Sequence, residues 1–277
     1  MAQILLATDL TAHADRALDR AVMLAAARQA RLGLVHVVSA ELRNAAAQEQ
    51  AVAEARAALA RYIAESALPA DLPVDQTVLC GEPDEAIIAA ARDSHPELLV
   101  VGGANADLLE RLFRRSVIQQ VVRHAPCPVL VVHRRARTGY GRVVVATDLS
   151  LPARRALEFA LRFLPGTEMT VLHVARTDAP ALGADDVRLK LDDLVTASLA
   201  RLAQEGLPPP ASVTPLVETG SAREIVPAVV ERLGADLAVM GTLGLTGAAG
   251  LLMGSTAEGL IGALRCDVMA VKDQPGA

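Results

Sequence analysis

Aromatic side chains are almost absent from this sequence of 277 residues: there is no tryptophan, and aromatic residues make up 2% of the total. Proteins that bind single-stranded nucleic acid stack the bases on aromatic side chains, so this chain lacks the usual platform for such binding. Its net charge of −5 also provides no excess of positive charge to attract a phosphate backbone. We therefore expect no nucleic acid among its partners.

Cysteine is scarce as well. The three cysteines, Cys80, Cys127 and Cys266, form no CxxC pair, and their number is odd. We therefore expect neither a disulfide framework nor a zinc site, and this usage fits a reducing compartment. The N-terminus lacks the basic segment of a signal peptide and reaches Asp9 too early for its apolar segment. These features predict a cytoplasmic protein.

The sequence consists of two similar halves. Residues 4–11 (ILLATDLT) reappear 139 positions later as residues 143–150 (VVVATDLS). Further landmarks recur in the same order at shifts of 137 to 139: His36 and His173, Gly81 and Gly220, residues 99–102 and 238–241, Ser116 and Ser255, Cys127 and Cys266. Such a repeat indicates two homologous domains, residues 1–137 and 138–277, joined near residues 134–139.

Charged residues are missing from residues 237–257, a stretch about as long as a membrane span. Its counterpart in the first half, residues 98–117, carries five charged residues. A segment with five charges does not span a bilayer. We therefore interpret the uncharged stretch as a buried strand followed by a glycine-rich loop, and we expect no membrane association.

Each half alternates short apolar runs, typical of parallel strands buried on both faces, with helical patterns. The predicted strands are 4–7, 32–38, 74–79, 98–101 and 129–133, then 142–146, 169–174, 212–218, 236–240 and 268–271. The first predicted helix is capped by Thr11. The other predicted helices are 40–68, 83–94 and 116–124 in the first half, and 152–163, 184–205, 222–233 and 255–264 in the second. This alternation predicts an α/β fold with two tandem doubly wound, parallel five-stranded sheets flanked by helices, with ligands bound at the carboxyl ends of the strands.

The loop after the fourth strand of the second half carries the strongest functional signal. Its pattern is G-x2-G-x9-G-[ST], from Gly241 through Gly244 to Gly254 and Ser255. Glycines let backbone N–H groups approach an anion closely, and the N-terminus of the following helix adds a partial positive charge. The loop contains no lysine, so it is not a Walker A motif, and backbone amides with a divalent cation would have to neutralise a phosphate. The alternative is that the glycines only form turns.

Together, the ATDL[ST] start, the [LV]HV second strand and the glycine motif resemble the universal stress protein family over nearly the whole chain, twice. The resemblance implies a strand order of 3-2-1-4-5 in each half. It implies that ATP binds between the loops that follow strands 1 and 4 in members that keep the glycine motif, and we expect Mg to be the divalent cation that accompanies it. It also implies that homologues pair through the last strand, so the two halves would imitate such a dimer internally; a homodimer of the whole chain stays open.

Carried onto this sequence, the resemblance predicts cofactor-binding residues in the second half only. They are Ala146, Thr147, Asp148, Val174, Met240, Gly241, Gly244, Gly254, Ser255 and Thr256. Asp148 has an alternative role as a turn residue, since aspartate favours turns. In the first half, Asn105 and Arg115 stand where the second half has glycine, and acidic side chains enter the loop. We therefore predict that the first half binds ATP weakly or not at all, although Arg114 and Arg115 leave another anion open.

No strong catalytic constellation is present. There is no GxSxG or HExxH motif, and His36 and His173 lie within apolar strands, where we predict hydrogen-bonded core residues. Slow ATP hydrolysis is the most that this inventory supports. The leading hypothesis is a cytoplasmic stress-response protein that binds ATP or another adenine nucleotide and acts as a switch on an unknown protein partner. The alternatives are a slow ATPase of the same fold and a nucleotide-free interaction scaffold.

Overall fold

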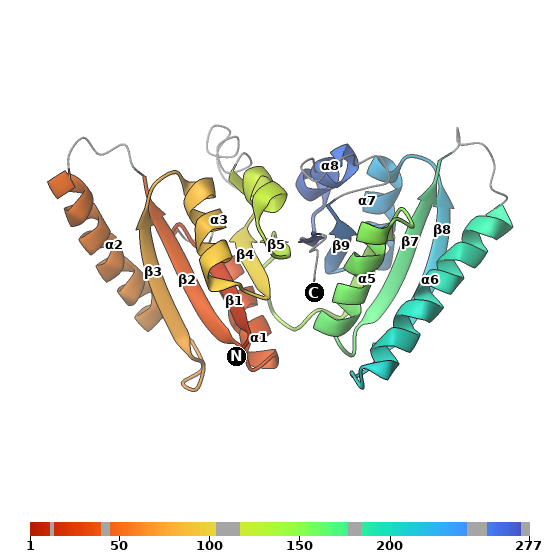
Figure 1. Cartoon of the computed structure of the whole chain (residues 1–277), viewed down its shortest axis with the longest axis horizontal. Coiled ribbons are helices and arrows are strands. Elements are labelled where there is room, and N and C mark those ends of the chain that lie inside the picture. The colour runs from red at the N-terminus through yellow and green to blue at the C-terminus, as the bar shows by residue number, and fades with distance from the viewer. Residues whose placement is uncertain (12–13, 40–44, 104–116, 177–183, 243–253, 273–277) are drawn as a thin grey trace. The chain divides into compact units, whose positions relative to one another are not determined.

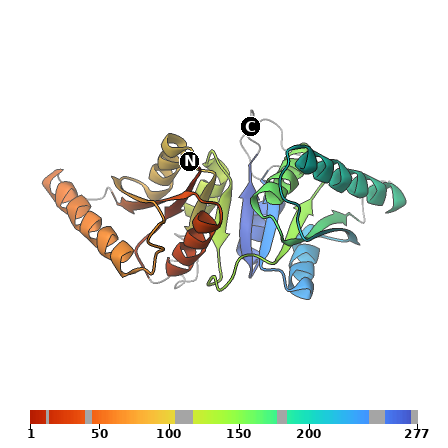
Figure 2. The same cartoon turned by 90° about the horizontal axis from the view of Figure 1, so that it is seen from below.

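The computed structural model describes the whole chain except residues 12–13, 40–44, 104–116, 177–183, 243–253 and 273–277 (Figure 1). The chain divides into two compact units, Met1–Gly139 and Tyr140–Ala277. In each unit, helices cover both faces of a parallel sheet, as Figure 2 shows. The predicted α/β class is therefore confirmed.

In its described part, the first unit has five parallel strands in the order β3-β2-β1-β4-β5. The strand order reverses between β1 and β4, and in such sheets ligands bind beside the carboxyl ends of the strands at this switch point. The strands are β1 (Gln3–Ala7), β2 (Arg31–Val38), β3 (Val74–Cys80), β4 (Leu98–Gly102) and β5 (Val129–Val132). The helices are α1 (Asp15–Ala27), α2 (Ala45–Glu65), α3 (Pro83–Ser94) and one over residues 117–124.

The second unit repeats this order within its described residues, as β8-β7-β6-β9-β10. Its strands are β6 (Arg142–Thr147), β7 (Glu168–Ala175), β8 (Ser212–Thr219), β9 (Leu237–Gly241) and β10 (Asp267–Val271). Its helices are α5 (Leu151–Phe163), α6 (Ala184–Gln204), α7 (Ala222–Leu233) and α8 (Ser255–Ala263). The predicted order 3-2-1-4-5 is confirmed in both units, and every predicted strand agrees with the structure to within one residue.

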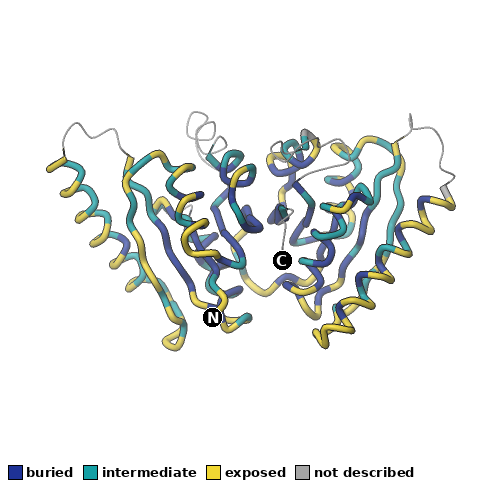
Figure 3. Tube along the Cα trace, in the orientation of Figure 1, coloured by how far each residue is buried: buried dark blue, intermediate teal, exposed yellow. Residues whose placement is uncertain are grey.

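Aliphatic side chains form most of the core of each unit. The central strands are buried almost completely, whereas the outer helices α2 and α6 expose much of their surface (Figure 3). Helix α5 packs one face against the sheet, because its buried residues recur at the spacing of a single helical face. They include Ala153, Ala156, Leu157, Ala160 and Leu161. Burying a leucine such as Leu157 contributes about 1.5–3 kcal/mol, which fixes α5 on the sheet beside β6 and β9.

The start of the first helix differs from the prediction. Helix α1 begins at Asp15 without a side-chain cap, so Thr11 is not its N-cap. The Thr11 hydroxyl instead donates to Asp9 Oδ1 over 2.7 Å, within the turn after β1. In the second unit the equivalent Ser150 does cap α5 and accepts a hydrogen bond from Ala153 N over 3.3 Å. The repeat therefore conserves the turn but not the capping role.

The end of α2 also differs. The predicted helix extends to Leu68, but α2 ends at Glu65. A proline disfavours the helical conformation in the residue before it, and Pro69 follows Leu68 directly. The proline therefore excludes Leu68 from the helix.

Candidate functional site

The turn after β6 is built from the side chains of the repeated ATDL[ST] segment. Thr147 Oγ1 accepts a hydrogen bond from Leu149 N over 3.0 Å, and Asp148 Oδ1 accepts one from Ser150 N over 3.0 Å. Leu149 has a φ of 63°, which is costly for a residue with a side chain. The two side-chain hydrogen bonds hold this conformation. Asp148 therefore has the turn role that the sequence left open, in addition to any role toward a ligand.

The first unit forms the same turn after β1. Thr8 Oγ1 accepts from Leu10 N over 3.1 Å, and Asp9 Oδ1 accepts from Thr11 N over 3.0 Å. Leu10 has a φ of 60°, within a few degrees of its counterpart in the second unit. A strained leucine at the same place in both copies indicates that the segment encodes a specific turn at the switch point.

A histidine on the neighbouring strand supports each turn. His173 Nδ1 lies 2.9 Å from the Thr147 carbonyl oxygen, and His36 Nδ1 lies 2.9 Å from the Thr8 carbonyl oxygen. A carbonyl oxygen can only accept, so Nδ1 carries the proton in both rings. These half-buried histidines are therefore hydrogen-bonded within the fold, as the sequence predicts. Val174, the next residue of β7, is half-buried.

The end of β9 lies beside the end of β6. Ala146 and Met240 are register partners across the two strands, which brings these two predicted site residues together. Met240 is only 3% exposed, so it offers little surface to a ligand. A Cβ on Gly241 would lie 3.2 Å from Pro152 O and Ala153 N. Close packing of the start of α5 therefore favours glycine at this position, whether or not a ligand approaches it.

The glycine that precedes α8 has a different explanation. Gly254 has a φ of −61°, which any residue adopts, so the backbone conformation does not require glycine here. Its N–H donates to Thr242 O over 2.9 Å, and Thr242 N–H donates to Val271 O over 3.0 Å. These bonds hold the start of α8 beside the ends of β9 and β10.

The N-cap residue of α8 is Gly254, which has no side chain to cap the first turn. The first N–H groups of a helix lack partners within the helix and carry a partial positive charge, so they suit an anion. Thr256 is exposed in this first turn. By contrast, Ser150 caps the N-terminus of α5. Gly244 lies outside the described residues, as do Asn105, Arg114 and Arg115 in the corresponding loop of the first unit.

The first unit has a cavity of about 320 Å³ at the corresponding edge of its sheet. Residues from β1, β2, β4, α1, α3 and the helix over 117–124 line it, and most of them are aliphatic. The sequence analysis missed the wall that α3 provides through Pro83 and Ile87. The apolar face at the start of α3 could have predicted this wall, because α3 follows a strand that ends at the same edge of the sheet.

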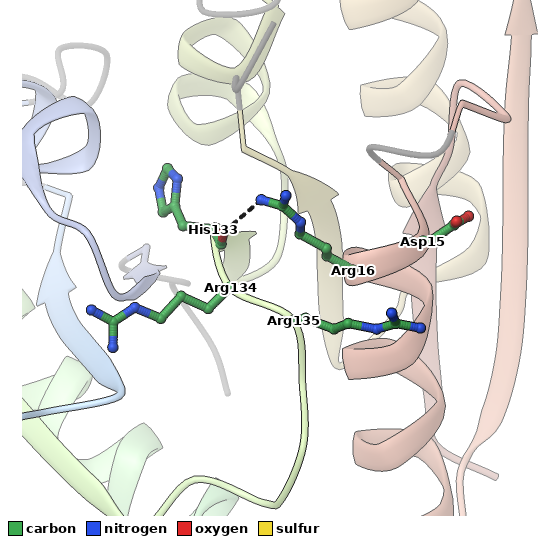
Figure 4. A pocket seen from close by; sticks show the side chains of 5 residues that line it. All are labelled: Asp15, Arg16, His133, Arg134 and Arg135. Carbon is green, nitrogen blue, oxygen red and sulfur yellow. Dashed lines mark hydrogen bonds between the residues drawn. The ribbon is translucent and has the colours of Figure 1, made fainter.

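A second hollow of about 500 Å³ lies in the first unit beside the end of β5, and its wall includes three arginines (Figure 4). Arg16 Nη1 donates to His133 O over 3.3 Å, and Arg135 forms an ion pair of 3.0 Å with Asp19. Figure 4 shows Arg134 and Arg135 extending away from each other. The guanidinium groups do not converge on one point, so we do not assign an anion site here.

The described residues lack two further features. Within them, no three His, Cys, Asp or Glu side chains gather in a way that would hold a metal ion. Among the helices of the same residues, none combines the length and the apolar character needed to cross a membrane.

Comparisons with known proteins agree on one family. A sequence profile of the universal stress protein family matches residues 1–133 and again residues 139–272. Universal stress protein E of Salmonella typhi is 28% identical over 244 residues, which cover 82% of this chain and 77% of that protein. A universal stress protein of Thermus aquaticus is 36% identical over 135 residues, 47% of this chain and 96% of that protein. A crystal structure of a universal stress protein from Archaeoglobus fulgidus covers 98% of this chain and 96% of that one, with 22% identity and a TM-score of 0.68.

Proposed function

The chain belongs to the universal stress protein family as a tandem two-domain member, and we propose that it binds an adenine nucleotide in its second unit and acts as a nucleotide-dependent switch in the stress response. The ligand in this proposal is ATP with Mg, and the signal passes to a protein partner. A cytoplasmic location belongs to the same proposal and rests on the cysteine usage of the sequence.

One observation carries the proposal: the N-terminus of α8, whose N-cap residue Gly254 has no side chain, lies beside the carboxyl end of β9. The hydrogen bond from Gly254 N–H to Thr242 O fixes this juxtaposition. The first-turn amides of α8 and the exposed Thr256 hydroxyl would hold phosphate oxygens. Bound magnesium would neutralise part of the phosphate charge, since no lysine follows the glycines in the loop.

The glycine pattern supports the same reading. Packing against α5 explains Gly241, but neither φ nor any capping bond explains Gly254. A residue without a side chain at the N-terminus of a helix leaves room for a ligand to approach the backbone. Close approach of a phosphate is therefore our explanation for glycine at position 254.

The adenosine would lie at the ends of β6 and β7. In this proposal the backbone from Ala146 to Asp148 contacts the ribose and the base, and Val174 contacts the base. The His173 bond and the side-chain bonds of Thr147 and Asp148 hold this edge in place before a ligand arrives. Such preorganisation reduces the ordering cost of binding.

Thermal melting in the presence of Mg-ATP tests the proposal. A ligand that binds only the folded state at about 100 times its Kd stabilises that state by about 2.7 kcal/mol. We expect a rise in the melting temperature of the native chain and no rise for a Gly254→Arg variant, which copies the first-half residue Arg115 into the second half. If Mg-ATP left the melting temperature of the native chain unchanged, that result would favour a nucleotide-free scaffold. ATP hydrolysis by the native chain that disappears in Asp148→Ala would favour the slow ATPase.

A further inference from the structure

The cavity of the first unit differs in chemistry from the site proposed in the second. Among the residues of its lining that the structure describes, none is aromatic or positively charged. Its walls are aliphatic and come from elements far apart in the sequence, including Val35, Ile87, Val101, Ile118 and Val121. Most of these side chains are buried in the walls, so their positions are fixed by the core.

One carboxylate lies among the described residues that line this cavity. Asp9 is the one charged residue of that described lining. Its Oδ1 is oriented by hydrogen bonds from Thr11, so the carboxylate is fixed at the end of β1. A carboxylate repels an anion, and the aliphatic walls offer an anion no replacement for its hydration. The cavity therefore disfavours phosphates and carboxylates.

The repeat shows which polar group the first unit has lost. At the shift of 139 residues, Val117 stands where the second unit has Thr256, and Ile118 stands where it has Ala257. Both Val117 and Ile118 line the cavity. A hydroxyl that suits a phosphate in the second unit is therefore replaced by a methyl group, and the neighbouring position gains apolar bulk.

The size of the cavity suits a small molecule. Small-molecule sites commonly enclose ~300–1,000 Å³ and are mainly apolar with a few polar groups. The cavity encloses about 320 Å³, at the lower end of that range. An apolar cavity of ~150 Å³ already binds benzene, so this one has room for a larger aliphatic group.

From this lining, charge and size, we propose that the first unit binds an uncharged, mainly aliphatic small molecule rather than a nucleotide. The two units then take ligands of different chemistry at corresponding edges of their sheets. This inference depends only on residues of the first unit, so it stands or falls independently of nucleotide binding in the second.

A titration of the full-length chain with 1-octanol and with octanoate tests this inference, because the two probes share an alkyl chain and differ in charge. With labelled isoleucine methyl groups, we expect octanol to shift the NMR signals of Ile87 and Ile118. Ile63 on α2 and Ile225 on α7 do not line the cavity and serve as internal controls. Octanoate should bind at least about tenfold more weakly, because its carboxylate would lose hydration and face Asp9.

Two variants sharpen the result. Ile118→Gln should remove the octanol-dependent shift of Ile87. Asp9→Asn keeps an oxygen that can accept from Thr11 N–H, so it should preserve the turn. Because it removes the negative charge, it should reduce the difference between the affinities for octanol and for octanoate. Asp148→Asn is the matched control in the second unit and should leave that difference unchanged.

Either of two results would overturn the inference. One is an octanol titration that shifts Ile87 and Ile118 no more than Ile63 and Ile225. The other is octanoate or Mg-ATP binding in the first unit at least as tightly as octanol. A failure of Mg-ATP to bind the second unit would leave the octanol result untouched, so the two proposals fail separately.

Discussion

His173 donates its Nδ1–H to the carbonyl oxygen of Thr147 over 2.9 Å, which joins β7 to the end of β6 at the proposed adenosine site. The first unit contains the same bond, at the same length, between His36 and Thr8. The two hydrogen bonds can therefore be compared within one chain. Both support a turn, but only the bond of His173 is predicted to lie beside a nucleotide.

Replacing His173 with alanine should weaken nucleotide binding and lower stability. A hydrogen bond contributes about 0.5–1.5 kcal/mol, and the lost ring contacts add to that cost. Chemical denaturation measures the stability, and calorimetry measures the affinity for Mg-ATP. His36→Ala is the control: it should cost similar stability in the first unit and leave the affinity unchanged. Equal losses of affinity in the two variants would show that His173 has no local role at the site.

Replacing Thr256 with valine should weaken nucleotide binding without unfolding the chain. Thr256 is exposed in the first turn of α8, and valine copies the first-unit residue Val117. A hydrogen bond to a charged group contributes about 1.5–3 kcal/mol, so the Kd for Mg-ATP should rise at least about tenfold. Val117→Thr is the reciprocal control. An unchanged Kd in Thr256→Val would remove this hydroxyl from the site.

Replacing Gly241 with alanine should destabilise the second unit. The new Cβ would lie 3.2 Å from the backbone of Pro152 and Ala153, tighter than ordinary contact, so the start of α5 must shift. Overpacking of this kind costs about 1–3 kcal/mol. Urea denaturation measures the change. Gly139→Ala is the control, because its Cβ would meet nothing within 4 Å. If the two variants were equally stable, close packing would not explain Gly241.

Stability should fall at high pH because of Tyr62. Burial and the hydrogen bond from its hydroxyl to Asp15 Oδ1 (3.0 Å) raise the pKa of Tyr62 above its ordinary value of about 10. The folded state therefore holds this proton more tightly than the unfolded state does. The resulting stabilisation is complete below about pH 10 and is lost as the pH rises from there toward the folded pKa.

The variant Tyr62→Phe isolates this contribution. Its free energy of unfolding should fall less steeply than that of the native chain above about pH 10, where the unfolded tyrosine ionises. Denaturation series at several pH values measure both slopes. Identical slopes would show that the tyrosine proton is not linked to folding.

The sequence predicted the strands to within one residue because their signals are local, whereas their order followed from the family resemblance. Apolar runs such as residues 98–101 and 237–240 and the ATDL[ST] turn depend on neighbours in the chain. The packing role of Gly241 could not be predicted, because its partner Pro152 is distant in sequence and only the packing of α5 brings it close; its contact with a ligand stays a prediction. Ile87 in the first-unit cavity was missed for the same reason. The roles proposed for Gly254 and Thr256 stay predictions.

Isothermal titration calorimetry of the full-length chain with Mg-ATP tests the central claim most directly. We predict one equivalent bound per chain, with no saturable binding in the Gly254→Arg variant. Binding of two equivalents would contradict the assignment of the site to the second unit, and the absence of binding to the native chain would contradict the claim that α8 receives a nucleotide phosphate.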